Sequence, residues 1–185
     1  MVSHLLVPWP DPMLPQGCAI TVQIKPESGS LFLHYELTGD LDALRLPERA
    51  AQPKPQDDLW RHTCFEAFLG DPAGPRYVEF NFSPSGCWAG YAFSRLRTRA
   101  TPGPAAMTHG PICKHNNHTL TLEVRLRIGS LPWPMTDGAP LGLAAVLEAR
   151  DGHLTYWALR HPGAKPDFHD RGGWIARAVA KDDPE

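Results

Sequence analysis

Glu66, Glu79 and Asn81 are polar residues whose types and spacing suit a binding site. Glu66 stands in one run of alternating apolar residues, and Glu79 and Asn81 stand in the next run. Alternation turns all three side chains away from the predicted core, and pairing of the two runs as a hairpin makes them neighbours on one face. Carboxylate and amide groups bind hydroxyl groups, and Trp60, at the entry of the first run, offers an aromatic face for a sugar ring. These residues predict a site for a small polar ligand such as a sugar; an exposed polar sheet face with a tryptophan capping the core edge is the alternative.

The two glutamates also allow a catalytic interpretation. Carboxyl groups about 5 Å apart, the spacing of neighbours on adjacent strands, act in retaining glycosidases. The sequence contains none of the GxSxG, HExxH, P-loop or GxGxxG motifs that accompany other common chemistries. We therefore expect a non-catalytic protein that binds a small molecule, a sugar or sugar derivative, with a carboxylate-pair glycoside hydrolase as the alternative.

Arginine side chains gather at two further places. Arg95, Arg97 and Arg99 fall on one face of a strand or of its exit, and Arg125 and Arg127 share a face of another strand. Guanidinium groups bind carboxylate or phosphate groups in a bidentate manner, so Arg95 and Arg97 are candidate partners of an anionic sugar. Alternatively, these cations only keep an exposed strand edge from pairing with another chain.

The segment 161–169 holds His161, Asp167 and His169, which are possible metal ligands. No helical or strand spacing presents the two imidazoles together, and two prolines predict a rigid loop at the rim of a site instead. The four cysteines stand singly, without a CxxC pair, which argues against a structural zinc site. We expect no metal and no other cofactor.

The elements that position these residues are predicted as strands, because apolar residues alternate between closely spaced turns. Crossover helices long enough for a parallel sheet are absent, so antiparallel hairpins are expected. The predicted fold is all-β, a two-sheet antiparallel β-sandwich of jelly-roll-like form with little helix, in a single domain over residues 1–185. A long loop is expected at 38–58, with one helical turn at 41–44, and further short strands between 105 and 113. The eight main strands are predicted at 18–24, 31–37, 63–69, 76–82, 87–97, 120–128, 142–149 and 154–159, with Val78, Phe80, Phe82, Leu122, Val124 and Leu126 in the core.

Charge and length exclude several classes of partner. The 185 residues carry 18 Lys and Arg against 20 Asp and Glu, a net charge of -2, so no overall positive field draws the chain to nucleic acid or to an anionic membrane. No apolar run approaches the roughly 18 residues that a membrane-spanning helix requires. The first residues lack a basic segment and contain several prolines, which favours a cytoplasmic protein without a signal peptide.

Three segments together resemble a known family. They are LWRHTCFEAFL (59–69), YVEFNFSPSGCWAGYAF (77–93) and YWALRHPGAKPDFH (156–169). They are similar to DOMON-like domains, β-sandwiches related to family 9 carbohydrate-binding modules, and more narrowly to an uncharacterised bacterial branch of them, over roughly residues 18–174. The resemblance implies a sandwich that binds sugars in some branches of the family and haem in others.

The resemblance also implies roles for single residues. Trp60 and Glu66 fall at the tryptophan and the acidic residue of the sugar-module motif, and Glu79 and Asn81 lie where the family has its next polar strand. A second aromatic residue of the sugar clamp would be Trp157 or Phe168. Haem-binding members use a methionine and a histidine as axial ligands. A haem-binding redox module is therefore an alternative, but a weak one, because the methionines, Met1, Met13, Met107 and Met135, stand in terminal or Pro/Gly-rich segments.

Overall fold

The computed structural model describes residues 1–103, 107, 109–131, 133 and 138–178. About half of these residues lie in strands and 7% in short 3-10 helices, which confirms the prediction of an all-β fold with little helix. Within the described residues, no helix has the length and apolar character needed to cross a membrane. The elements are β1 (Val2–Pro8), β2 (Ala19–Glu27), β3 (Ser30–Thr38), η1 (Leu41–Ala43), η2 (Leu59–Arg61), β4 (Cys64–Gly70), β5 (Tyr77–Phe82), β6 (Trp88–Arg95), β7 (Thr98–Ala100), β8 (Ile112–His115), β9 (Thr119–Arg127), η3 (Ile128–Ser130), β10 (Ala139–Glu148), β11 (Leu154–Ala158), η4 (Arg171–Gly173) and β12 (Ala176–Ala178).

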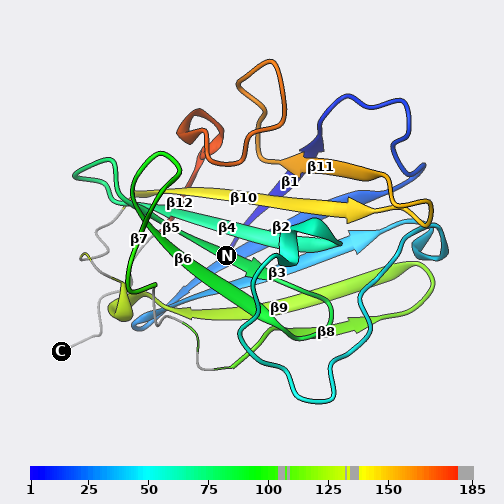
Figure 1. Cartoon of the computed structure of the whole chain (residues 1–185), viewed down its shortest axis with the longest axis horizontal. Helices are drawn as coiled ribbons and strands as arrows, with labels where there is room; N and C mark the ends of the chain where they lie inside the picture. Colours follow the sequence, from blue (N-terminus) through cyan, green and yellow to red (C-terminus); the bar gives the residue numbers. More distant parts are fainter. Residues whose placement is uncertain (104–106, 108, 132, 134–137, 179–185) are drawn as a thin grey trace.

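Hydrogen bonds join the twelve strands of the described part into one antiparallel sheet that does not close on itself. Its order is β7-β6-β5-β4-β10-β11-β1-β2-β3-β9-β8, with β12 paired to β10 (Figure 1). Strand β1 is the link, because it pairs with β2 on one side and with β11 on the other. The strand order thus supports the antiparallel prediction, whereas the division into two sheets of a jelly roll stays a prediction.

The main core lies between strands β2, β3 and β9 and strands β4, β5 and β10. Tyr35 of β3 reaches across it, donating a hydrogen bond of 2.9 Å to the backbone oxygen of Glu66 on β4, and its ring lies 5.3 Å from that of Phe65. The alternation in the sequence identified this core correctly. All six residues predicted to lie in it, Val78, Phe80, Phe82, Leu122, Val124 and Leu126, are buried.

The opposite face of β4, β5 and β6 is buried as well. Every residue of β4 and β5 is buried, and a second apolar cluster that includes Phe68, Tyr77 and Trp174 covers this face. Glu66, Glu79 and Asn81 are only 3%, 6% and 0% exposed. The alternative of a solvent-exposed polar sheet face is therefore wrong, because distant loops pack over the strands.

The eight main predicted strands correspond to β2, β3, β4, β5, β6, β9, β10 and β11, and η1 lies where one helical turn was expected. Strand β8 begins at the end of the segment where short strands were expected. The sequence did not predict β1, β7 or β12. Strand β1 ends at Pro8, the first of four prolines in the N-terminal segment, and its pairing with the next strand, β2, and with the distant strand β11 stabilises it. The predicted strand 87–97 instead ends at Arg95, where the chain turns through Arg97 with a positive φ of 54°.

Candidate functional site

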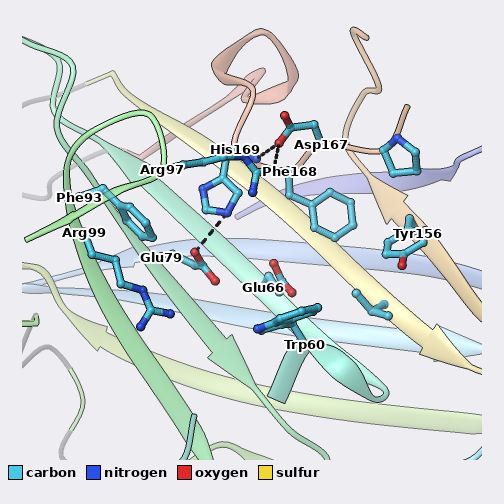
Figure 2. A pocket seen from close by; sticks show the side chains of 12 residues that line it. Trp60, Glu66, Glu79, Phe93, Arg97, Arg99, Tyr156, Asp167, Phe168 and His169 are labelled. Atoms are coloured by element: carbon cyan, nitrogen blue, oxygen red, sulfur yellow. Dashed lines mark hydrogen bonds and ion pairs between the residues drawn. The ribbon is translucent and has the colours of Figure 1, made fainter. Parts of the chain in front are cut away.

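A pocket of about 480 Å³ lies on the outer face of the consecutive strands β6, β5, β4, β10 and β11 (Figure 2). Side chains of these strands form its floor, and η2 and the loop after β11 form its walls. Because the floor crosses five strands, residues from segments far apart in the sequence meet there. The pocket is lined by Trp60, Glu66, Glu79, Phe93, Arg97, Arg99, Val146, Tyr156, Pro166, Asp167, Phe168 and His169.

Five of the eight residues proposed from the sequence line this pocket: Trp60, Glu66, Glu79, Arg97 and Phe168. Asn81 does not line it, since it lies fully buried and donates a hydrogen bond of 2.6 Å to Glu79 Oε1. Arg95 is exposed outside the pocket, where its guanidinium contacts Thr98. Trp157 faces the main core, and its indole N–H donates to Thr155.

Local geometry explains these differences. Tyr156 and Trp157 are consecutive, so alternation along β11 sends Tyr156 to the pocket and Trp157 to the core. A register shift between Phe93 and Arg95 turns Arg95 out of the regular strand pattern. Seven lining residues were not proposed as ligand-binding from the sequence: Phe93, Arg99, Val146, Tyr156, Pro166, Asp167 and His169. Of these, Pro166, Asp167 and His169 lie in the loop after β11, and they reach the pocket only because that loop docks on distant strands.

Glu66 occupies the middle of the pocket floor on β4. Its carboxyl group has no hydrogen-bond or ion-pair partner within the described part of the chain, although its backbone oxygen accepts from Tyr35. Burial, together with the neighbouring charge of Glu79, raises the pKa of Glu66 well above its ordinary value. Glu66 is therefore a buried acid that faces the pocket and holds its proton over an extended pH range.

Glu79, on β5, is a diagonal neighbour of Glu66, because Glu66 pairs with Asn81 and Glu79 pairs with Phe68. Diagonal positions are about 7 Å apart rather than the about 5 Å of directly opposed residues. The directly opposed arrangement of the two glutamates that suggested a retaining glycosidase is therefore not the arrangement of these strands. Burial raises the pKa of Glu79, while the Asn81 hydrogen bond and the charges of Arg99 and Arg97 act to lower it.

His169 stands beside Glu79 on the loop wall, with 3.6 Å between Nε2 and Glu79 Oε2. Burial lowers the pKa of His169 to about 4, with a further contribution from Arg97, so the imidazole is neutral near pH 7 and this contact is not a charged pair. The Tyr77 hydroxyl accepts the Arg97 backbone N–H at 3.0 Å, and its own proton is therefore available to His169 Nδ1 at 2.7 Å. That arrangement assigns the imidazole proton to Nε2, which faces Glu79.

The Arg97 side chain joins two parts of the rim. Its Nη2 lies 2.7 Å from Asp167 Oδ1 and so connects the turn after β6 to the loop after β11 (Figure 2). The same carboxylate accepts the backbone N–H of His169 at 3.0 Å. The guanidinium of Arg99 instead lies 4.0 Å from the ring centre of Tyr91. Both cations thus have partners within the protein.

Aromatic rings form much of the pocket wall. Trp60, on η2, is 43% exposed, and Arg61 lies 5.2 Å from its ring centre. Phe168 packs edge-on against Tyr156, with 6.0 Å between the ring centres. The pocket therefore combines polar groups on its floor with apolar ring faces on its walls, the usual composition of a small-molecule site.

The segment that suggested a metal site does not bring its three residues together. Only Asp167 and His169 line the pocket, while His161 bonds to the backbone oxygen of Val7 at 2.9 Å and packs edge-on against Trp9. Among the described residues, no group of three or more His, Cys, Asp or Glu side chains is arranged to hold a metal ion. Of the methionines, Met135 lies outside the described residues, and the other three do not line the pocket.

The fold has a counterpart among solved structures. It is similar to that of a candidate carbohydrate-binding protein from Bacteroides uniformis ATCC 8492, with a TM-score of 0.69 at 14% sequence identity. The match covers 94% of this chain and 84% of that one. No protein-family model matches the chain, and no curated protein matches it. At this level of identity the comparison establishes a shared fold.

Proposed function

We propose that the pocket binds a small carbohydrate and does not transform it. The observation that carries the proposal is the meeting of the exposed Trp60 ring, the loop residue Phe168 and the buried Glu66 carboxyl in one pocket. Sugars present an apolar ring face and a belt of hydroxyl groups, and this combination offers a surface for each. The volume of about 480 Å³ lies within the range of small-ligand sites.

In this proposal the sugar ring stacks on Trp60, and its hydroxyl groups donate to the carboxyl oxygens of Glu66 and Glu79. Arg97 and Arg99 stand at the side of the pocket, where their N–H groups donate to ligand oxygens. The similarity to DOMON-like domains, with Trp60 and Glu66 at the sugar-module positions, supports the proposal. The description of the Bacteroides uniformis protein as a candidate carbohydrate-binding protein supports it too. On the basis of the same two similarities, we propose that the chain has the DOMON-like sandwich architecture.

A glycan array followed by calorimetric titration tests this proposal. Trp60→Ala and Glu66→Gln should each weaken the binding of the best array ligand by at least about tenfold, because stacking platforms and buried acceptors dominate binding energy. Two variants outside the pocket serve as controls: Arg95→Ala at its exterior and Glu36→Gln on β3 should change the affinity by less than about threefold.

Two results would overturn the proposal. One is the absence of any glycan that binds with a dissociation constant below about 1 mM. The other is hydrolysis of a chromogenic glycoside that is lost in both Glu66→Gln and Glu79→Gln, since the protein would then be a glycoside hydrolase.

A further inference from the structure

The pocket floor presents two buried carboxyl groups to a ligand, and the described cations around the pocket leave Glu66 unpaired. Building on the proposed carbohydrate function, we propose that the preferred ligand is an amino sugar, whose ammonium group binds between Glu66 and Glu79.

Glu66 is the unpaired acid. It is 3% exposed and lines the pocket, yet its carboxyl group has no hydrogen-bond or ion-pair partner among the described residues. A buried carboxylate without a partner is costly, and a second carboxyl at the diagonal position of the next strand adds like-charge repulsion. An ammonium group compensates for both effects, because it carries one positive charge and three N–H donors.

The protein's own cations do not serve this role for Glu66. Arg97 is bonded to Asp167 at 2.7 Å, and Arg99 lies over the Tyr91 ring at 4.0 Å. Both act on Glu79, whose pKa they lower, whereas the pKa of Glu66 reflects burial and Glu79 alone. The imidazole of His169 contacts Glu79 rather than Glu66. The positive charge around the pocket is therefore concentrated on the Glu79 side, and the Glu66 side is open to a cation from the ligand.

The aromatic walls of the pocket also suit an ammonium group. Trp60, Phe93, Tyr156 and Phe168 all line the pocket. The face of an aromatic ring attracts an ammonium group within about 6 Å of its centre, and the attraction strengthens when water is excluded. A neutral sugar gains only stacking and hydroxyl bonds from these groups. An N-acetylated sugar replaces the cation by a bulkier neutral amide and leaves Glu66 without a charge partner.

Calorimetric titration of the intact chain with matched sugars tests the inference. The probes are an amino sugar, its neutral parent and its N-acetyl derivative in three ring configurations: glucosamine, glucose and N-acetylglucosamine, with the corresponding galactose and mannose sets. In at least one configuration the amino sugar should bind at least about tenfold more tightly than its parent and its N-acetyl derivative, since a buried charge pair is worth at least that ratio.

Two variants then test which residue causes the preference for the amino sugar. Glu66→Gln keeps the shape of the side chain and removes its charge, so the ratio of amino-sugar to parent affinity should fall to about one. Trp60→Ala should weaken both ligands and still leave the amino sugar the more tightly bound of the two, because it removes stacking common to both and only one of the four aromatic rings that attract the ammonium group. Circular dichroism shows whether each variant is folded. The comparison of ligands on the unmodified protein needs no variant at all.

The outcomes separate this inference from the function on which it rests. If neutral sugars bind as tightly as their amino counterparts, the amino-sugar preference is wrong and the carbohydrate function stands. If the amino sugar is preferred but Glu66→Gln keeps the preference, the assignment to Glu66 is wrong. If none of these sugars binds, the amino-sugar inference is wrong, and the glycan array decides separately whether the carbohydrate function stands.

Discussion

Glu66 and His169 face the same pocket, and burial favours the neutral form of both. It raises the pKa of the Glu66 carboxyl well above its ordinary value and lowers the pKa of the His169 imidazole to about 4. Near neutral pH the imidazole beside Glu79 is therefore uncharged, and Glu66 keeps its proton to a higher pH than an exposed glutamate does. The two side chains make stability depend on pH in opposite directions, and each can be tested separately.

The first prediction concerns the Glu66→Gln variant at alkaline pH. The folded protein holds the Glu66 proton to a higher pH than the unfolded chain does, so Glu66 lowers stability as the pH rises from about 4.5 through the folded pKa. An amide has no such proton to lose. In urea unfolding, Glu66→Gln should match the unmodified protein at about pH 4 and be the more stable of the two at about pH 8. A less stable variant at about pH 8 would mean that ionised Glu66 has a stabilising partner.

The second prediction concerns the acid sensitivity contributed by His169. Its folded pKa of about 4 lies below its ordinary value of 6.5, so its stabilisation is present above about pH 6.5 and is lost as the pH falls toward about 4. At about 1.4 kcal/mol per pH unit, the loss over that interval is about 3 kcal/mol. His169→Gln should flatten the decline in unfolding free energy between those two pH values. The exposed His115 on β8 provides the control, since His115→Gln should leave the slope unchanged.

At the scale of elements, strand β10 holds the covering loops close to the pocket floor. Gly142 of β10 lies directly beneath the indole of Trp174, where an added Cβ would overlap Cδ1 and lie 2.8 Å from Cγ. The indole cannot easily move aside, because its N–H donates to the Phe168 backbone oxygen at 2.9 Å and its ring stacks on Phe68. Close packing between β10 and Trp174 therefore also positions Phe168 in the pocket wall.

The third prediction follows from this packing. Gly142→Ala should lower the unfolding free energy by about 1 to 3 kcal/mol, the usual cost of an overpacked contact, and should weaken ligand binding through the displacement of Phe168. Gly129→Ala is the matched control, since nothing lies within 4 Å of its added Cβ. The control should change stability by no more than about 0.5 kcal/mol. Equal stability of the two variants would show that Trp174 moves aside without cost.

The fourth prediction contrasts a residue on the core face of the β4 and β5 hairpin with a residue of the pocket. Phe80 is 1% exposed on the core side, and Trp60 is 43% exposed at the pocket entrance. Phe80→Ala should cost about 3 to 5 kcal/mol of stability, because it removes a large buried ring. Trp60→Ala should cost about 1 kcal/mol or less while reducing sugar binding. Thermal unfolding and titration of both variants distinguish a core residue from a binding residue.

At the scale of the whole molecule, the fold is held by apolar packing on both faces of the β4, β5 and β10 region of the sheet. The fifth prediction is that the purified protein is colourless and that a chelator leaves its melting temperature unchanged. Its basis is the sequence, which lacks clustered cysteines and a well-placed methionine and histidine pair. A stoichiometric Soret band, or the loss of cooperative unfolding in the chelator, would contradict it.

The alternation of side chains along a strand is a local property. The sequence alone therefore determined where the main strands lie and which face each of their side chains takes. Period two placed the eight main strands, assigned Phe80 and Val124 to the core, and turned Glu66 and Glu79 toward the other face. Trp60 could also be placed near Glu66 from the sequence, because it lies in the short segment that leads into the strand of Glu66.

Tertiary structure decided whatever depends on contacts between distant segments. The pairing of β10 with β4 and with β11 brings Val146 and Tyr156 into the same pocket as Glu66, and the docking of the loop after β11 covers a face that alternation alone marks as polar. The same docking brings Phe168 into the pocket wall and places His169 against Glu79. Such contacts join residues as far apart in the sequence as Glu79 and His169, and no periodicity within one run of sequence encodes which distant run will pair with it.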